Sequence, residues 1–204
     1  MTKVQILIFN GFDELDALAP FEVLRTATEI GADIQAELVT LDDPTEITAD
    51  HGLRVQPDAK LKLDRQLDVL LIPGGGWFGN APQGAKAEVK RNAIPKAILQ
   101  LHQQGTTIAS VCTGGMLVAA TGLLSGRPAI THHLAIEDLK KAGADVIKAR
   151  VVDDGDVITA GGVTSGLDLA LWLLERYLNP EIAYKVETIL EYERRGTVWR
   201  RSAA

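Results

Sequence analysis

The chain has 204 residues, of which 46% are apolar, 24% are charged and 5% are aromatic. This is the composition of an ordinary globular protein, and it excludes disordered, collagen-like and coiled-coil chains. The 21 Lys and Arg residues stand against 27 Asp and Glu, and a net charge of −6 argues against a nucleic-acid partner bound through its phosphates. The apolar runs are far shorter than the roughly 20 residues of a membrane span, so we expect no membrane partner.

The N-terminal residues run directly into a strand-like segment without a recognisable signal peptide, so we expect a cytoplasmic protein. Cys112 is the only cysteine. A single cysteine cannot form an intramolecular disulfide or a thiolate zinc cage, so its chemistry must involve other residue types.

Short segments rich in Val and Ile, bounded by turn residues, predict buried strands, and amphipathic or apolar segments between them predict helices. The predicted strands are Val4–Phe9, Ile34–Leu41, Val69–Ile72, Thr106–Val111, Pro128–Thr131, Val146–Val152 and Val157–Ala160. The predicted helices are Ala19–Glu29, with Pro20 in its first turn, Ala85–Gln104, Gly114–Leu124, Ser165–Tyr177 and Pro180–Arg194.

Strands that alternate with helices imply βαβ units and a mostly parallel sheet covered on both faces, in one domain. The residues Asp153-Asp154-Gly155-Asp156 separate the last two strands and predict a hairpin within this sheet. The tail from Arg194 to Ala204 carries four arginines, and we expect it to be a solvated end or a dimer contact.

A strand-to-helix turn carries Cys112. The buried strand ends at this residue, and Thr113, Gly114 and Gly115 follow before an apolar helix. Such a turn presents one side chain at the carboxyl edge of the sheet, where open α/β folds bind ligands. The amides at the start of the helix favour the thiolate, which is the nucleophilic form. The pattern predicts a catalytic cysteine, and a small buried apolar side chain is the alternative.

Glycines at positions 74, 75 and 76 follow the strand Val69–Ile72 after a single proline. Exposed amides at Gly74 and Gly75 would suit an anion or an oxyanion, and a plain tight turn is the alternative. The segment is not a phosphate-binding loop, because no Gly-Lys-Ser/Thr follows, and it lacks the dinucleotide fingerprint G-x-G-x-x-G.

Three acidic residues, Asp13, Glu14 and Asp16, follow the first strand. A carboxylate at this edge of the sheet can exchange a proton with a nearby thiol or with a substrate. The spacing alone does not choose among the three, and capping of the helix N-terminus is the alternative use of each.

Two adjacent histidines, His132 and His133, follow the short strand that ends at Thr131. Adjacent side chains point in different directions, so we do not expect this pair to bind a metal. A Cys–His dyad with Cys112 is an alternative that the sequence spacing leaves open. Gly162, between a strand and a helix, is expected either to line the same pocket or to precede a capped helix start.

In this order, the elements resemble the ThiJ/PfpI superfamily, whose fold is a flavodoxin-like, three-layer α/β/α sandwich related to class I glutamine amidotransferases. The resemblance covers the chain from Val4 to about Tyr192. It rests on an acid four residues before a proline, Asp16 and Pro20, and on the segments Ile-Pro-Gly-Gly-Gly, Ser-Val-Cys-Thr-Gly, Thr-His-His and Ala-Gly-Gly-Val-Thr-Ser-Gly-Leu-Asp. It implies one domain over residues 1–193, with a nucleophile elbow, and a basic tail over residues 194–204.

The residue after the cysteine separates the branches of this superfamily. The protease-like branch has a histidine there, whereas Thr113 and an aspartate at the acid position look like the isocyanide hydratase branch. The resemblance selects Asp16 as the acid and Cys112 as the nucleophile. It departs at His133, because isocyanide hydratases commonly have Thr-His-Trp, which implies a pocket of different shape or polarity. Related domains precede the DNA-binding helices of AraC-type regulators, for which we expect no room after Tyr192.

The resemblance implies a homodimer that hydrates an isocyanide to an N-substituted formamide without a cofactor or metal. Cys112 would form a covalent thioimidate, Asp16 would exchange protons, and Thr113 would orient either side chain. The substrate and oxyanion pocket would include Gly74, Gly75, His132 and Gly162. The alternatives are a glyoxalase- or deglycase-like enzyme acting on reactive carbonyls, which usually has Glu at the acid position, and a redox-sensing stress protein in which the thiol oxidises to the sulfinate.

Overall fold

The computed structural model of the chain describes residues 1–43, 45–63, 67–79 and 81–201. Its main sheet has the strand order β12-β10-β11-β7-β6-β1-β2-β5. These strands are β1 (Thr2–Leu7), β2 (Ile34–Thr40), β5 (Ala59–Lys60), β6 (Val69–Ile72), β7 (Thr107–Val111), β10 (Val151–Asp153), β11 (Val157–Ala160) and β12 (Trp199–Arg200). All neighbours pair in parallel except β10 and β11, as the alternation of strands and helices predicts.

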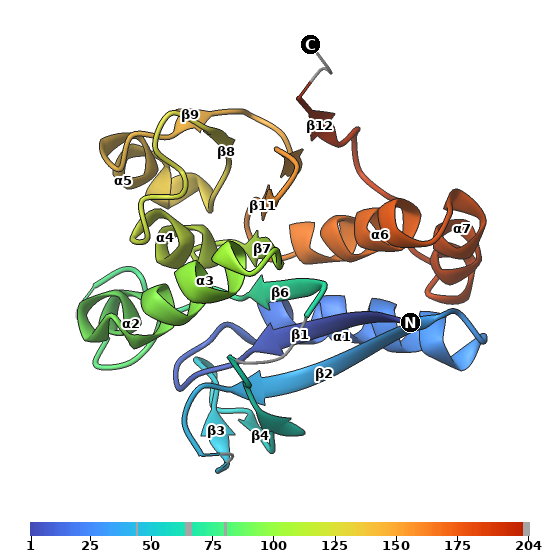
Figure 1. Cartoon of the computed structure of the whole chain (residues 1–204), viewed down its shortest axis with the longest axis horizontal. Helices are drawn as coiled ribbons and strands as arrows, with labels where there is room; N and C mark the ends of the chain where they lie inside the picture. Colours follow the sequence, from blue (N-terminus) through green and yellow to red (C-terminus); the bar gives the residue numbers. More distant parts are fainter. Residues whose placement is uncertain (44, 64–66, 80, 202–204) are drawn as a thin grey trace.

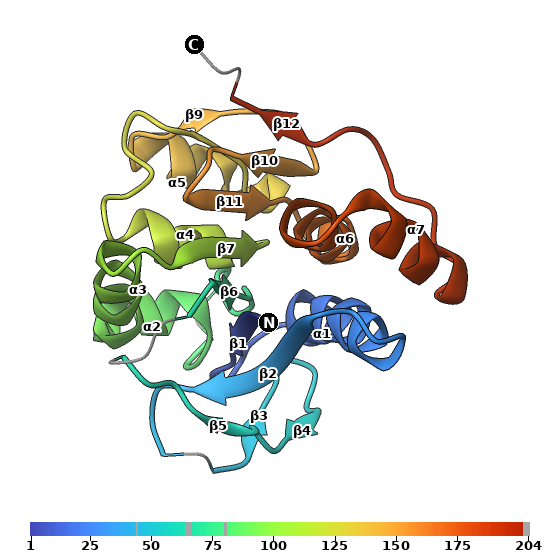
Figure 2. The same ribbon diagram turned by 45° about the vertical axis from the view of Figure 1, so that its right-hand side comes forward.

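Helices cover both faces of the sheet (Figure 1 and Figure 2). One layer contains α1 (Glu14–Glu29), α6 (Ser165–Tyr177) and α7 (Pro180–Ile189), and the other contains α2 (Ala85–Arg91), α3 (Ala93–Gln103), α4 (Gly114–Ala119) and α5 (Ile136–Lys141). Every residue of β6 and β7 is buried, as expected for central strands of a parallel sheet that is covered on both faces. The expected three-layer, flavodoxin-like sandwich is therefore confirmed.

The first helix begins five residues earlier than the sequence analysis predicts. The Asp13 side chain caps α1 by accepting a hydrogen bond from the Leu15 amide at 3.1 Å. Pro20 consequently lies inside the helix rather than in its first turn. A proline there removes one helical hydrogen bond, and the pattern-based start was wrong because it treated Pro20 as a start signal.

The predicted helix Ala85–Gln104 is two helices. Asn92 has a φ of 60°, and its amide closes α2 by donating to the Glu88 carbonyl at 2.9 Å. Asparagine tolerates this left-handed conformation, and Pro95 then stands in the first turn of α3. A continuous apolar face hides such a break, because both helices bury the same side.

Several predicted elements are shorter than expected. The helix predicted to reach Leu124 ends at Ala119, and the helix predicted to reach Arg194 ends at Ile189. The strand predicted over 146–152 is two pieces, β9 (Asp145–Val146) and β10, and β9 pairs with β8 (Pro128–Ala129) in a separate sheet. Six further elements of the described chain were not predicted, namely β3 (Ile47–Thr48), β4 (Arg54–Val55), the 3₁₀ turn η1 (His133–Ala135), and β5, β12 and α5.

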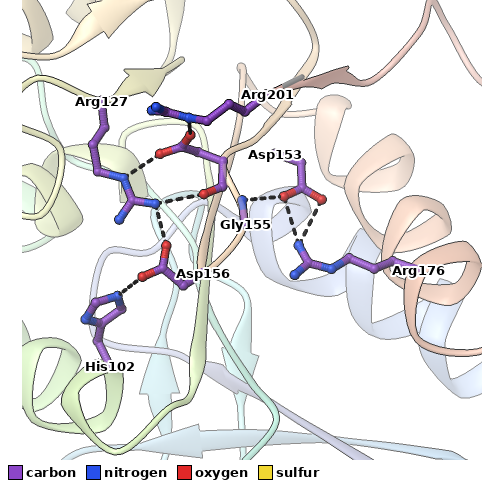
Figure 3. Close-up of polar contacts among 8 residues, drawn as sticks. His102, Arg127, Asp153, Gly155, Asp156, Arg176 and Arg201 are labelled. Atoms are coloured by element: carbon purple, nitrogen blue, oxygen red, sulfur yellow. Dashed lines mark hydrogen bonds and ion pairs between the residues drawn. The ribbon is translucent and has the colours of Figure 1, made fainter. Parts of the chain in front are cut away.

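The predicted hairpin between β10 and β11 is confirmed, and Figure 3 shows the charged network that holds its turn. Asp154 pairs with Arg127 and Arg201, and Asp156 pairs with Arg127 and His102.

The described part of the C-terminal tail contacts the domain, while Arg195, Arg200 and Arg201 are exposed to solvent. Residues 199–200 form the edge strand β12 beside β10, and Arg194 binds Glu175 and Glu187 on α6 and α7. Residues 202–204 of the predicted tail lie outside the described residues. Within the described part of the chain, no helix is both long and apolar enough to cross a membrane.

Candidate active site

Cys112 occupies a sharp turn between β7 and α4. Its φ is 56°, a left-handed conformation that is uncommon for a residue with a side chain and that is found at functional sites. The turn is packed backbone to backbone against the loop after β6. A Cβ added at Gly114 would lie 2.1 Å from the Ile72 carbonyl oxygen, and one at Gly74 would lie 2.4 Å from Thr113 Oγ1. Glycine is therefore required at both positions to close the elbow.

Two neighbouring segments hold the backbone of Cys112. Its amide donates to the carbonyl oxygens of Ala160 at 3.1 Å and Gly161 at 2.9 Å. Its own carbonyl oxygen accepts a hydrogen bond from Thr131 Oγ1 at 2.7 Å. The nucleophile is thus fixed by the carboxyl ends of β7, β8 and β11, although these segments lie far apart in the sequence.

Asp16 is fully buried in the first turns of α1, and its carboxyl interacts with the Cys112 thiol. The Gly74 amide donates to Asp16 Oδ2 at 2.9 Å, while Oδ1 is buried without a conventional hydrogen-bond partner among the described residues. Burial, reinforced by the negative charge of Asp13, raises the pKa of Asp16 to about 7. Near neutral pH this carboxyl is therefore able both to give and to take a proton.

The other two acidic residues have different partners. Asp13 caps α1, which is the alternative role the sequence analysis left open. Glu14 accepts hydrogen bonds from the backbone amide of His51 at 2.9 Å and pairs with its ring at 2.8 Å. Of the three acids, the structure places Asp16 beside the thiol.

The structure raises rather than lowers the pKa of Cys112, to about 12. Burial is the main cause and the Asp16 carboxylate is the second, and together they outweigh the amides of Thr113 and Val163, which lower this pKa. The expected stabilisation by a helix N-terminus is weak because α4 has only six residues. The thiol and the carboxyl behave as one coupled pair, in which Asp16 loses its proton first.

Hydrogen bonds connect Thr113 and the glycines after β6 to the pair of Asp16 and Cys112. Thr113 Oγ1 accepts a hydrogen bond from the Gly75 amide at 3.0 Å, in a buried contact. Since the Gly74 amide binds Asp16, the amides of both glycines are occupied by side chains of the site instead of facing a ligand. These two contacts align the carboxyl and the elbow with each other.

Val163, which the sequence analysis did not single out, supplies a backbone amide to the Cys112 sulfur. It has a φ of 42°, a conformation that is a genuine outlier for a β-branched residue. With the Thr113 amide it forms the donor pair that a negative sulfur or an oxyanion would meet. The sequence feature that could have indicated Val163 is the Gly161-Gly162 pair just before it, because paired glycines after a strand indicate a close approach of two backbone segments.

His132 lies against Gly162, where an added Cβ would be 2.6 Å from the imidazole Cδ2. The ring also lies 4.4 Å from the His133 ring and 5.7 Å from the Phe78 ring, centroid to centroid. Burial lowers the pKa of His132. Among the described residues, neither histidine is hydrogen-bonded to Cys112, so the structure brings His132 and Gly162 to the wall of a pocket rather than to the thiol.

That pocket is bounded by residues from three segments that meet beside the elbow. It is lined by Ile130, Thr131, His132, His133, Ile136, Ala149, Arg150, Gly161, Gly162, Val163 and Ser165. Its lining is mixed, with two histidines, Arg150, Thr131 and Ser165 as well as aliphatic residues and glycines. Within the described part of the chain, no cluster of three or more His, Cys, Asp or Glu side chains is arranged to hold a metal ion.

Comparisons with known proteins match this chain to one family and to one fold. The model of the DJ-1/PfpI family matches residues 2–176. An isonitrile hydratase from Pseudomonas putida is 32% identical over 190 residues, which cover 93% of this chain and 78% of that protein. A deglycase from Thermococcus kodakarensis is 30% identical, over 85% of this chain and 96% of that protein. The crystal structure of a ThiJ/PfpI family protein from Pseudomonas syringae superposes with a TM-score of 0.82 at 26% identity, covering 96% of this chain and 76% of that chain.

Proposed function

This chain belongs to the DJ-1/PfpI family, and on that premise we propose that it is a cysteine-dependent hydratase that converts an isocyanide into an N-substituted formamide. The observation that carries the proposal is the buried pair of Asp16 and Cys112, with Thr113 directly after the nucleophile. The similarity to an isonitrile hydratase over 93% of the chain supports it.

The first half of the reaction joins the thiol to the terminal isocyanide carbon. The Asp16 carboxylate takes the thiol proton as the sulfur forms its bond to that carbon. The same proton is then delivered to this carbon, so the product is a thioimidate in which the carbon bears one hydrogen, one sulfur and a double bond to nitrogen. A base is needed because the pKa of Cys112 is about 12, which leaves very little free thiolate at neutral pH.

The second half hydrolyses the thioimidate. Asp16 accepts a proton from water as the water oxygen adds to the carbon, and it passes this proton to the nitrogen. The carbon–sulfur bond then breaks as Asp16 takes the proton of the new hydroxyl group and returns it to the sulfur, and the formamide leaves. The amides of Thr113 and Val163 stabilise negative charge on the departing sulfur. One water is consumed and the cysteine is regenerated, so the chemistry needs no external oxidant or reductant.

A deglycase-like reaction on reactive carbonyls is the second candidate, because the similarity to a deglycase covers 85% of this chain. It would use the same thiol and carboxyl. Asp16 is one methylene shorter than the glutamate that is usual in that group, so it holds the proton at a different distance from the attacked carbon.

The two candidates are separated by assaying the purified protein with para-nitrophenyl isocyanide and with methylglyoxal. We expect formamide product from the isocyanide and much slower loss of methylglyoxal. The Cys112→Ser variant should lose isocyanide turnover while keeping its fold, since a hydroxyl is a far weaker nucleophile near neutral pH. Faster turnover of methylglyoxal would favour the second candidate, and near-normal hydration by the serine variant would exclude covalent catalysis.

A further inference from the structure

The turn over residues 161–164, which connects β11 to α6, contacts Cys112 through its backbone. The Gly161 carbonyl accepts the Cys112 amide at 2.9 Å, and the Val163 amide interacts with the sulfur. Val163 has its φ at 42°, so the turn is held in a conformation that a valine does not prefer. Surrounding groups must therefore fix this turn for its donor and acceptor to meet the nucleophile.

Arg150 holds the turn at both ends. Its carbonyl oxygen accepts the Gly161 amide at 2.9 Å, and its Nη2 donates to Thr164 Oγ1 at 3.2 Å. Its Nε donates to Asp168 Oδ2 at 2.6 Å. The side chain of Asp168 is only 4% exposed, so this ion pair is shielded from water on the carboxylate side. Arg150 thus contacts the turn on both sides of Val163, at Gly161 and at Thr164.

Asp168 is itself anchored by the C-terminal part of the chain. The Tyr192 hydroxyl donates to its carboxylate at 3.1 to 3.2 Å, and the Arg195 amide donates to Oδ1 at 2.9 Å. Four donor groups from Arg150, Tyr192 and Arg195 therefore converge on or beside a single buried carboxylate. Because Asp168 stands in the first turn of α6, it transmits this anchoring directly to the turn next to Cys112.

We propose that Arg150 is a positioning residue for Cys112, which acts by holding the 161–164 turn so that its carbonyl and amide groups meet the nucleophile. The inference deepens the proposed function, since it concerns the nucleophile of that reaction. It is independent of which substrate the thiol attacks.

The test replaces Arg150 by methionine and measures the second-order rate at which iodoacetamide alkylates Cys112 near neutral pH. The rate reports the fraction of thiolate, and a misplaced Val163 amide should lower it about tenfold, as expected for a lost hydrogen bond to a charged group. Thr164→Val removes only one contact of Arg150 at an exposed position, and we expect a fall of about threefold.

Arg176→Met is the matched control. Arg176 pairs with Asp153 at 2.8 Å, and Figure 3 shows this pair at the other end of α6. The side-chain exposures are 28% and 8% in this pair, against 29% and 4% for Arg150 and Asp168. The control should lower the urea midpoint about as much as Arg150→Met while leaving the alkylation rate unchanged.

Alkylation of the Arg150→Met variant at or above the rate of the Arg176→Met variant would overturn the inference. Should Arg150→Met fail to fold, Thr164→Val decides, because a rate equal to that of the parent would then exclude the positioning role. The measurement needs no substrate. If the parent protein hydrates no isocyanide but the three variants show the expected alkylation rates, the proposed function is refuted and the positioning role of Arg150 stands.

Discussion

The Gly74 amide donates a hydrogen bond to Asp16 Oδ2 at 2.9 Å, across 58 residues of sequence and in a buried environment. This single contact joins the loop after β6 to the first helix and fixes one oxygen of the carboxyl. The other oxygen, Oδ1, is buried without a conventional partner among the described residues, and the carboxyl interacts with the Cys112 thiol. The carboxyl is therefore oriented as a proton carrier rather than as a member of an ion pair.

The first prediction concerns the pH dependence of turnover. Asp16 must be ionised to accept the thiol proton, and its pKa is raised to about 7. We expect kcat/KM to rise as the pH increases through about 7, and to fall about 10²- to 10⁴-fold in Asp16→Asn, which also loses this pH dependence. A rise centred near the ordinary pKa of an aspartate would contradict the assignment of Asp16 as the base.

The same variant should behave in the opposite way toward alkylation. The Asp16 carboxylate raises the pKa of Cys112, so its removal should lower that pKa and speed the reaction with iodoacetamide at alkaline pH. Slower turnover combined with faster alkylation would separate loss of the base from damage to the thiol.

The second prediction concerns stability. The pKa of Asp16 is about 7 in the folded chain and about 4 in the unfolded chain, so the unfolded chain releases this proton first as the pH rises. The folded parent therefore loses stability between about pH 4 and about pH 7, by on the order of 4 kcal/mol. Asparagine does not titrate, so Asp16→Asn should gain stability relative to the parent across this window.

Urea unfolding of both proteins at the two ends of the window measures this difference. Glu22→Gln, which removes an exposed carboxylate from the same helix, is the control and should leave the difference between the two pH values unchanged. An equal stability gap between Asp16→Asn and the parent at both pH values would show that the buried carboxyl has an ordinary pKa.

The parts of the fold that the sequence predicts well are those set by local pattern and burial. The bounds of β6, β11 and α6 follow from largely apolar segments with turn or cap residues at their ends, and the structure reproduces them. The break at Asn92 escapes prediction, because it depends on one residue in a left-handed conformation within an unbroken apolar face. The start of α1 also escapes prediction, because its cap lies seven residues before Pro20, which is itself inside the helix.

The site divides in the same way. The elbow at Cys112 follows from a strand, two glycines and a helix, all of which are local. The raised pKa of the thiol does not follow from local sequence, because it depends on burial and on a carboxyl from a different segment. The roles of Gly74 and Gly75 also differ from expectation, because residues 16 and 113, distant in sequence, occupy their amides.

The third prediction concerns the Thr113 hydroxyl. Thr113→Val keeps the shape of the side chain but removes the acceptor for the Gly75 amide, which would then be buried without a partner. Such a loss costs about 1–3 kcal/mol, so we expect kcat/KM to fall about tenfold or more. Thr113→Ser restores the oxygen and should recover most of the activity, as measured by initial rates with the isocyanide. A serine variant as slow as the valine variant would show that the methyl group, and not the hydrogen bond, matters.

The last prediction concerns the two histidines. His132 packs on Gly162 and next to Phe78, and burial lowers its pKa, so it is a neutral wall of the pocket rather than a cationic partner of the thiol. A Cys–His dyad would instead place an imidazolium beside the sulfur and raise the thiolate fraction. We therefore expect His132→Asn and His133→Asn to leave the rate of Cys112 alkylation within about twofold of the parent, whereas His132→Asn should change KM by reshaping the pocket. The pH profile of alkylation measures this directly for the parent and both variants. A loss of alkylation of about tenfold near neutral pH in either variant would contradict this assignment and would favour a Cys–His dyad, in which the imidazolium stabilises the thiolate.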